Sequence, residues 1–84
     1  MTKVGDRDYD SERLATAVAQ AAAANGSRAG DAANLAQRVV TRVDNWLGDK
    51  TEITARELRL QTAAALADYD ADAAYLYENE NRLF

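Results

Sequence analysis

Few side chains in this sequence have the chemistry that catalysis needs. The 84 residues include no Cys and no His, which excludes thiolate or imidazole metal sites, Cys nucleophiles and His-based acid–base mechanisms. The Ser and Thr hydroxyls have no His or suitably placed Lys to activate them, and there is no glycine-rich phosphate loop of the Walker or dinucleotide type. We therefore expect that this protein is not an enzyme and has no catalytic residues.

Two acidic clusters are better explained by local structure than by chemistry. Asp68, Asp70 and Asp72 alternate at a predicted helix start, where alternate residues do not face one another and acidic residues complement the helix dipole. Residues 6–10 have some likeness to a calcium loop, but the glycine and the distant glutamate of EF-hand spacing are missing. We expect no metal site at either cluster.

Basic side chains near the first predicted helix are the remaining candidates for a binding site. Lys3, Arg7 and Arg13 lie close to its start, and Arg82 lies late in the last helix. Lys and Arg side chains that converge at a helix N-terminus suit a triphosphate, because they add charge and hydrogen-bond donors to the free amides. From composition alone, solvated arginines that form ion pairs are the better explanation.

Length and charge limit the class of protein. With 48% hydrophobic and 29% charged residues, we expect residues 1–84 to form one small globular domain. The net charge of −4 argues against direct nucleic-acid binding, because phosphate contacts need clustered Lys and Arg. The apolar runs fall far short of the roughly 20 residues of a membrane span, and the start lacks a signal-peptide pattern. We expect a cytoplasmic protein that does not bind membranes.

The clearest structural signal is a helical hairpin. Thr54 and Glu57 have the spacing of a capping box, so a helix is expected to start at Ala55. Its apolar stripe comprises Leu58, Thr62, Ala65, Leu66 and Tyr69, and the residues off the stripe include Arg59, Gln61 and Ala63. Asp70 is placed to cap a last helix that runs from Ala71 toward Leu83. Alanines on the inner faces predict closely spaced helix axes.

Two further helices precede this hairpin. Asp10 or Ser11 caps the first, which ends near Asn25 and Gly26. Its buried face is predicted to contain Leu14, Ala17, Val18 and Ala21. The second helix is expected to start at Gly30 or Asp31 and to stop at Gly48. Its stripe is the most regular in the chain and comprises Ala32, Leu35, Ala36, Val39, Val43, Trp46 and Leu47.

The first ten residues have two interpretations. Thr2–Val4 and Arg7–Tyr9 can form a short hairpin around a turn at Gly5 and Asp6, or this segment can be a frayed terminus held only by Tyr9. Residues 52–53 can add one further strand. The expected fold is mainly α (α+β): four helices with a short N-terminal β-hairpin or three-stranded cap. The aromatic residues expected in the core or at a groove edge, in preference to a base-stacking platform, are Trp46, Tyr69, Tyr75 and Tyr77.

The order of these features resembles an ATP-cone domain over nearly the whole chain. The resemblance begins with the series from Tyr9 to Leu14, followed by Ala17, Val18 and Ala21. The second helix is similar at Leu35, Ala36, Val39 and Val43, and the third at Thr54, Glu57, Leu58, Thr62 and Leu66. The last helix matches the family at its alanine and tyrosine positions, Ala71, Ala73 and Tyr77.

This resemblance implies a function. ATP-cones are small, mostly helical domains with a short sheet over one end; they bind ATP or dATP and switch oligomeric state, most often as N-terminal regulatory domains of ribonucleotide reductases and in a repressor of their genes. By resemblance, Lys3 and Val4 stand where a basic strand covers the nucleotide, and Arg13 stands where the first helix meets the phosphates. The residues that would border the base are Thr54, Leu58 and Arg59. With Arg7 and Arg82, these are the expected nucleotide-binding residues.

Some positions depart from the family pattern. Lys3-Val4-Gly5 replaces paired basic residues before a glycine, and the segment from Gly5 to Tyr9 is slightly short. Glu78 stands where the family has an Arg after Tyr77, and its carboxylate would repel a phosphate. Arg82, one helical turn further on, is the expected substitute.

Three hypotheses follow. The first is a non-enzymatic regulatory domain that binds ATP or dATP, with or without Mg²⁺, and controls the assembly of a homo-oligomer or a complex with a partner protein. The second is a ligand-free dimerisation or interaction module with an exposed apolar groove around Trp46, Leu60 or Phe84. The third is a regulatory domain of a larger enzyme, although the limits at Met1 and Phe84 favour a complete short chain.

Overall fold

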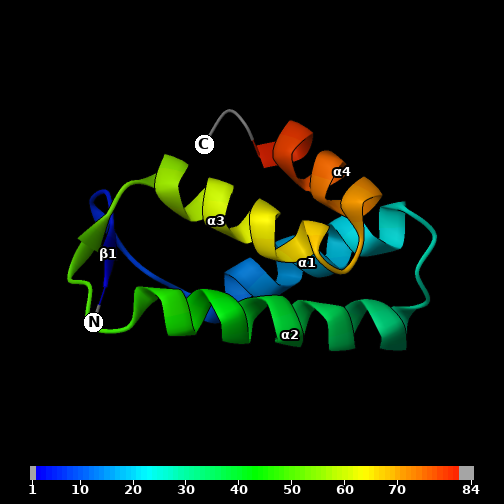
Figure 1. The fold of residues 1–84 in the computed structure, drawn as a ribbon, viewed down its shortest axis with the longest axis horizontal. Coiled ribbons are helices and arrows are strands. Elements are labelled where there is room, and N and C mark those ends of the chain that lie inside the picture. Colours follow the sequence, from blue (N-terminus) through cyan, green and yellow to red (C-terminus); the bar gives the residue numbers. More distant parts are fainter. Residues whose placement is uncertain (1, 82–84) are drawn as a thin grey trace.

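The computed structural model describes residues 2–81, which form four α-helices and three short β-strands (Figure 1). The strands are β1 (Lys3–Val4), β2 (Arg7–Asp8) and β3 (Glu52–Ile53). The helices are α1 (Ser11–Ala24), α2 (Ala29–Leu47), α3 (Ala55–Ala67) and α4 (Ala71–Asn81). The expected mainly α (α+β) class with an N-terminal strand cap is confirmed. Leu83, toward which the last helix was expected to run, lies outside the described residues.

The strands form one small mixed sheet at one end of the helices (Figure 1). β1 lies in the middle, antiparallel to β2 and parallel to β3. Gly5 has φ +63° in the turn between β1 and β2, a conformation that glycine adopts without a steric penalty. The Gly5 amide donates to the Ile53 carbonyl at 3.0 Å, which ties this turn to the start of α3. The predicted hairpin and further strand are therefore confirmed, and the frayed-terminus interpretation is wrong.

The predicted capping residues of three helices form the expected hydrogen bonds. The Asp10 carboxylate accepts from the backbone amides of Glu12 and Arg13 at 3.0 and 3.3 Å. Both bonds of the capping box between Thr54 and Glu57 are present, each at 3.0 Å. The Asp70 carboxylate accepts from the amide of Ala73 at 3.1 Å, as predicted for the start of α4. Local sequence therefore determines where α1, α3 and α4 begin.

The predicted start of α2 is wrong. We expected Gly30 or Asp31, but the helix begins at Ala29, and the carbonyl of Arg28 accepts the first helical hydrogen bond from Ala32 at 2.8 Å. Arg28 is extended and makes no side-chain cap, so the start carries none of the usual capping signals. Asp31 lies instead in the first turn, where its charge favours the helix dipole.

The core lies between the helices and contains most of the predicted apolar residues. Its largest fully buried side chains are Leu66, Val18, Val39, Val43 and Thr62. Two predictions for α3 are wrong. Ala63, expected off the stripe, is buried because α4 packs against that side of α3, whereas Tyr69 is 44% exposed because it lies in the turn after the helix.

Hydrogen bonds donated by side chains join distant parts of the chain and fix the elements to one another. The Tyr9 hydroxyl donates to Asp44 Oδ1 at 2.8 Å and the Thr2 hydroxyl to the Lys50 carbonyl at 2.7 Å, so residues on both sides of the β-hairpin are attached to the end of α2. At the other end of the molecule, Asn25 donates to both carboxylate oxygens of Asp70 at 3.1 Å. The sheet and the α4 start are thereby held in place.

Candidate functional site

The predicted nucleotide-binding residues come together only in part. Val4 pairs with Ile53 across the parallel strands, and Thr54 follows Ile53 directly at the start of α3. Val4 and Leu58 are half-buried against the core. The Thr54 hydroxyl accepts from the Glu57 amide, so its acceptor capacity already serves the helix cap. The structure thus brings an apolar part of the predicted site to the junction between the sheet and α3.

The four described cations of the predicted site, Lys3, Arg7, Arg13 and Arg59, lie on four different elements. Lys3 Nζ forms an ion pair with Asp8 Oδ1 across the β-hairpin at 3.1 Å, and both side chains are more than half exposed. Arg7 is exposed on β2, at the edge of the sheet opposite β3. Arg13 is exposed in the first turn of α1, where its backbone amide is bound to Asp10. Arg82 lies outside the described residues. The charge of Lys3 is therefore partly compensated by Asp8 before any anion binds.

Arg59 on α3 lies beside residues of α4. It is half-buried and lines a small hollow together with Leu60, Tyr75, Glu78 and Asn79. Burial raises the pKa of the nearby Tyr77 phenol above its ordinary value, while a hydrogen bond with Thr62 and the charge of Arg59 partly oppose that rise. Arg59 and Glu78 thus face the same hollow, which places an acidic group beside a residue expected to border the nucleotide.

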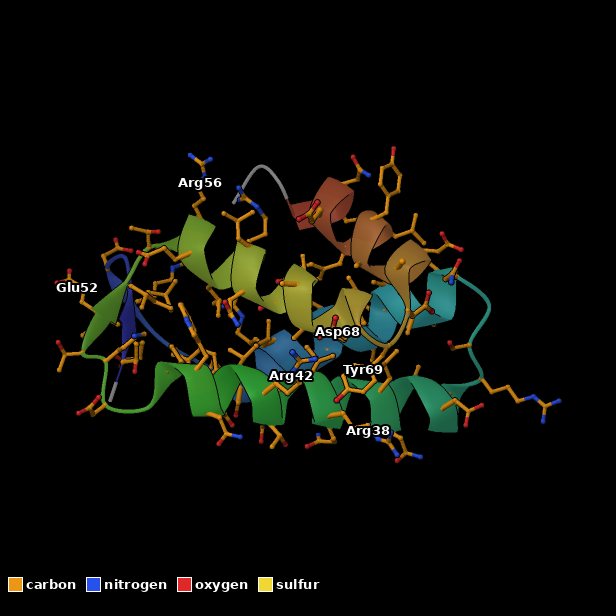
Figure 2. All side chains as sticks on the ribbon, viewed as in Figure 1. Arg38, Arg42, Glu52, Arg56, Asp68 and Tyr69 are labelled. Carbon is orange, nitrogen blue, oxygen red and sulfur yellow. The ribbon has the colours of Figure 1, made fainter. Side chains whose placement is uncertain are left out.

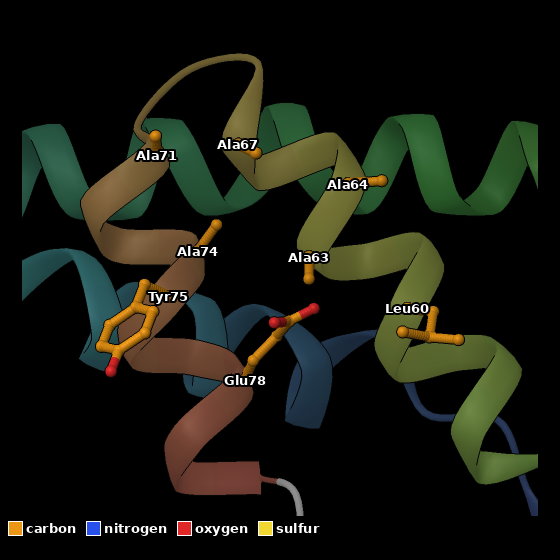
Figure 3. A pocket seen from close by; sticks show the side chains of 8 residues that line it. All are labelled: Leu60, Ala63, Ala64, Ala67, Ala71, Ala74, Tyr75 and Glu78. Carbon is orange, nitrogen blue, oxygen red and sulfur yellow. The ribbon is translucent and has the colours of Figure 1, made fainter.

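A shallow trough runs between α3 and α4, and we call it the α3–α4 trough (Figure 3). Its volume is about 310 Å³. The residues that line it are Leu60, Ala63, Ala64, Ala67, Ala71, Ala74, Tyr75 and Glu78. Figure 3 shows Leu60 and Tyr75 on opposite sides, with the Glu78 carboxylate between the two helices. Because the trough is open to solvent along its length, it suits a flat or helical partner better than an enclosed small molecule.

Sequence reasoning named two residues of this trough for a groove, Leu60 and Tyr75, and missed its alanines. Leu60 was one of three residues named for an exposed apolar groove. Of the others, Trp46 is half-buried on α2 with Lys50 Nζ 5.4 Å from its ring centre, and Phe84 lies outside the described residues. The available signal was helical spacing: positions 60, 64 and 67 of α3 and positions 71, 75 and 78 of α4 each share a face.

A second polar cluster has a structural explanation. Arg42 on α2 donates to Asp68 Oδ2 at 2.7 Å and lies 5.8 Å from the centre of the Tyr69 ring (Figure 2). A longer bond of 3.4 Å joins it to the Ala65 carbonyl. The hydrogen bond with Asp68 raises the pKa of Arg42 above its already high value, so the side chain stays charged. Arg42 therefore caps the end of α3 and holds it against α2.

Residues 2–81 contain no group of three or more acidic side chains arranged to hold a metal ion. In the same range, every helix is too short or too polar to cross a lipid bilayer.

Comparison with known proteins adds no relative. The chain matches no protein-family model, and no curated protein or solved structure is significantly similar to it.

Proposed function

We propose that this protein is a non-enzymatic regulatory domain that binds a purine nucleoside triphosphate, ATP or dATP, and controls its own association. The observation that carries the proposal is the position of β1. This strand lies between β2 and β3, so Lys3, Val4 and Gly5 are held beside the residues that lead into α3. A sheet at one end of four helices is also the arrangement that the resemblance to ATP-cones implies.

The residues near this sheet suggest how such a ligand would be held. Val4 and Leu58 offer partly exposed apolar surface for a base, and Lys3, Arg7 and Arg13 are the cations available for phosphates. Lys3 would exchange Asp8 for a phosphate, so binding must compensate for the loss of that exposed ion pair. The protein's net charge of −4 opposes an anionic ligand, and Mg²⁺ bound to the phosphates would lower that repulsion.

Thermal melts with ATP, dATP and GTP test the proposal. A ligand that binds only the folded protein stabilises it by about 2.7 kcal/mol at a hundredfold excess over Kd. For a domain of this size we expect the melting temperature to rise by roughly 10 °C or more. At ~1 mM nucleotide, the melt detects ligands whose binding free energy is about −4 kcal/mol or stronger. If no nucleotide changes the melting temperature at that concentration, nucleotide binding is refuted.

Calorimetric titration then assigns the residues. Lys3→Ala and Arg13→Ala are expected to weaken ATP binding, because each removes a cation from the proposed phosphate site. Arg38→Ala is the matched control, since Arg38 is exposed on α2 outside the proposed site (Figure 2). Equal affinities in all three variants would place the nucleotide elsewhere.

The second candidate function is a helical interaction module without a ligand. Two observations favour it. Lys3, one of the cations proposed to bind phosphate, already forms an ion pair with Asp8. Glu78, which lines the α3–α4 trough, stands at the position where the ATP-cone pattern has an Arg. This alternative expects an association state that does not respond to nucleotide. Light scattering with and without ATP distinguishes the two functions.

A further inference from the structure

We infer that Asn25 is a site of spontaneous deamidation, and that this modification breaks the connection between the end of α1 and the start of α4. The inference goes beyond the proposed function and does not depend on nucleotide binding. Three observations support it: Asn25 is followed by Gly26, the turn that contains both residues is exposed, and the Asn25 side chain is bound to Asp70.

The pair Asn25 and Gly26 has the chemistry that deamidation needs. Gly26 has no side chain, so its backbone nitrogen can approach the Asn25 Cγ atom with little steric hindrance. The other asparagines of the sequence are each followed by a large side chain, and they are Asn34, Asn45, Asn79 and Asn81. The first three also lie within α2 or α4, where helical hydrogen bonds hold the backbone. Asn25 is therefore the asparagine at which the reaction meets the least hindrance.

The reaction requires only water. The Gly26 backbone nitrogen gives its proton to water or hydroxide and forms a bond to Asn25 Cγ, while the bond from Cγ to the side-chain nitrogen breaks and ammonia leaves. The product is a cyclic imide. Water then adds to either carbonyl carbon of the imide and opens the ring. One opening leaves an aspartate at position 25, and the other leaves an isoaspartate, in which the main chain runs through the former side-chain carbon.

The fold leaves this turn open to water but restrains both reacting groups. Asn25 and Gly26 are exposed, and a Cβ atom added at Gly26 would meet no atom within 4 Å beyond its chain neighbours. The Gly26 amide donates to the Ala23 carbonyl at 3.0 Å, and Asn25 Nδ2 donates to Asp70 Oδ1 and Oδ2, each at 3.1 Å. Deamidation of the folded protein therefore requires these bonds to open, and helix ends open at low free-energy cost.

The modification changes the contact between α1 and α4 from attraction to repulsion. α4 begins beside the end of α1, and the Asp70 carboxylate accepts there from Asn25 and from the Ala73 amide (Figure 1). A carboxylate at position 25 has no proton to donate at neutral pH, so it would repel Asp70. It would also place a negative charge at the C-terminus of α1, whose last turn contains no basic residue. The start of α4 thereby loses this connection.

Incubation of the whole chain in mildly alkaline buffer, followed by peptide mass spectrometry, tests the site. The replacement of ammonia by water is expected at Asn25 before any other asparagine. In Asp70→Ser the rate at Asn25 should rise about fivefold, because Ser still caps α4 but is too short to hold the Asn25 amide. Asp72→Ser is the matched control, since Asp72 is exposed in the first turn of α4 and should leave the rate unchanged.

Two results of this incubation would overturn the site. One is deamidation of Asn25 only after urea has unfolded the chain. The other is deamidation of the folded chain that is no faster at Asn25 than at Asn34. An unchanged rate in Asp70→Ser would overturn the restraint that we assign to Asp70.

Thermal melts of substituted chains test the consequence for α4. Asn25→Asp, which reproduces the aspartate product, should lower the melting temperature by about 4–8 °C. Adding Asp70→Asn should recover most of this loss, because donor and acceptor are then exchanged and Asn still caps α4. Asn34→Asp is the control, since it adds the same charge at an exposed position of α2. If Asn25→Asp is as stable as the wild type, or if the double substitution recovers nothing, the proposed repulsion is wrong.

Discussion

Removing the Tyr9 hydroxyl group should measure how much its hydrogen bond to α2 contributes to the stability of the protein. In Tyr9→Phe the side chain keeps its half-buried packing but loses the 2.8 Å hydrogen bond to Asp44 Oδ1. Hydrogen bonds to charged groups contribute about 1.5–3 kcal/mol, but Asp44 is exposed and can recover water as a partner. We therefore expect a loss of about 1 kcal/mol at pH 7, which lowers the melting temperature by about 4–8 °C.

The pH dependence of this effect provides a sharper test. Burial, followed by the hydrogen bond and charge of Asp44, raises the pKa of Tyr9 well above its ordinary value of about 10. The folded protein therefore holds the phenolic proton more tightly than the unfolded chain does. The stability from this group is complete below about pH 10 and is lost as the pH rises through the unfolded value toward the folded one, by at most about 1.4 kcal/mol per pH unit. Partial exposure reduces that slope.

Thermal or urea melts at pH 7 and at about pH 11 measure the effect. At pH 7 the wild type should be more stable to unfolding than Tyr9→Phe. At the higher pH this difference in stability should disappear, because only the wild type has the titrating phenol. The control is Tyr75→Phe, since Tyr75 is 69% exposed and its loss should change stability little at either pH. A difference between wild type and Tyr9→Phe that is the same at both pH values would refute the linkage. A Tyr9→Phe and Asp44→Ala double-mutant cycle with no coupling energy would refute the contact itself.

Four further substitutions test the core, a helix cap and an ion pair. Leu66→Ala removes a fully buried side chain from the core and should cost about 3–5 kcal/mol, which lowers the melting temperature by more than about 10 °C; a loss below about 1 kcal/mol would contradict the assigned core. Thr54→Ala should cost about 1 kcal/mol in a thermal melt because the capping box at α3 is lost, whereas no change would show that tertiary packing alone starts this helix. Arg42→Ala and Asp68→Ala should show a coupling energy of no more than about 1 kcal/mol in urea melts, because their ion pair is solvent-exposed; a much larger value would mean that the pair is more buried than the structure shows.

The candidate site depended more on tertiary structure than the helices did. Sequence spacing placed Lys3, Arg7 and Arg13 near one another along the chain, but it could not specify that Asp8 pairs with Lys3 across the hairpin. It also could not orient Arg59, which lines a hollow with Glu78 because α4 packs beside α3. Side-chain direction at such positions follows from how helices are oriented relative to one another, and that orientation is a property of the whole core.

The sequence alone determined the helix signals at Asp10, Thr54 and Asp70 and the terminating glycines Gly26 and Gly48, because caps and left-handed turns depend on residues within one helical turn. Only the tertiary structure decided that β1 pairs with β3, some 50 residues away along the chain, and that Ala63 is buried. Both depend on which surfaces meet when the helices pack, and no local sequence pattern contains that information.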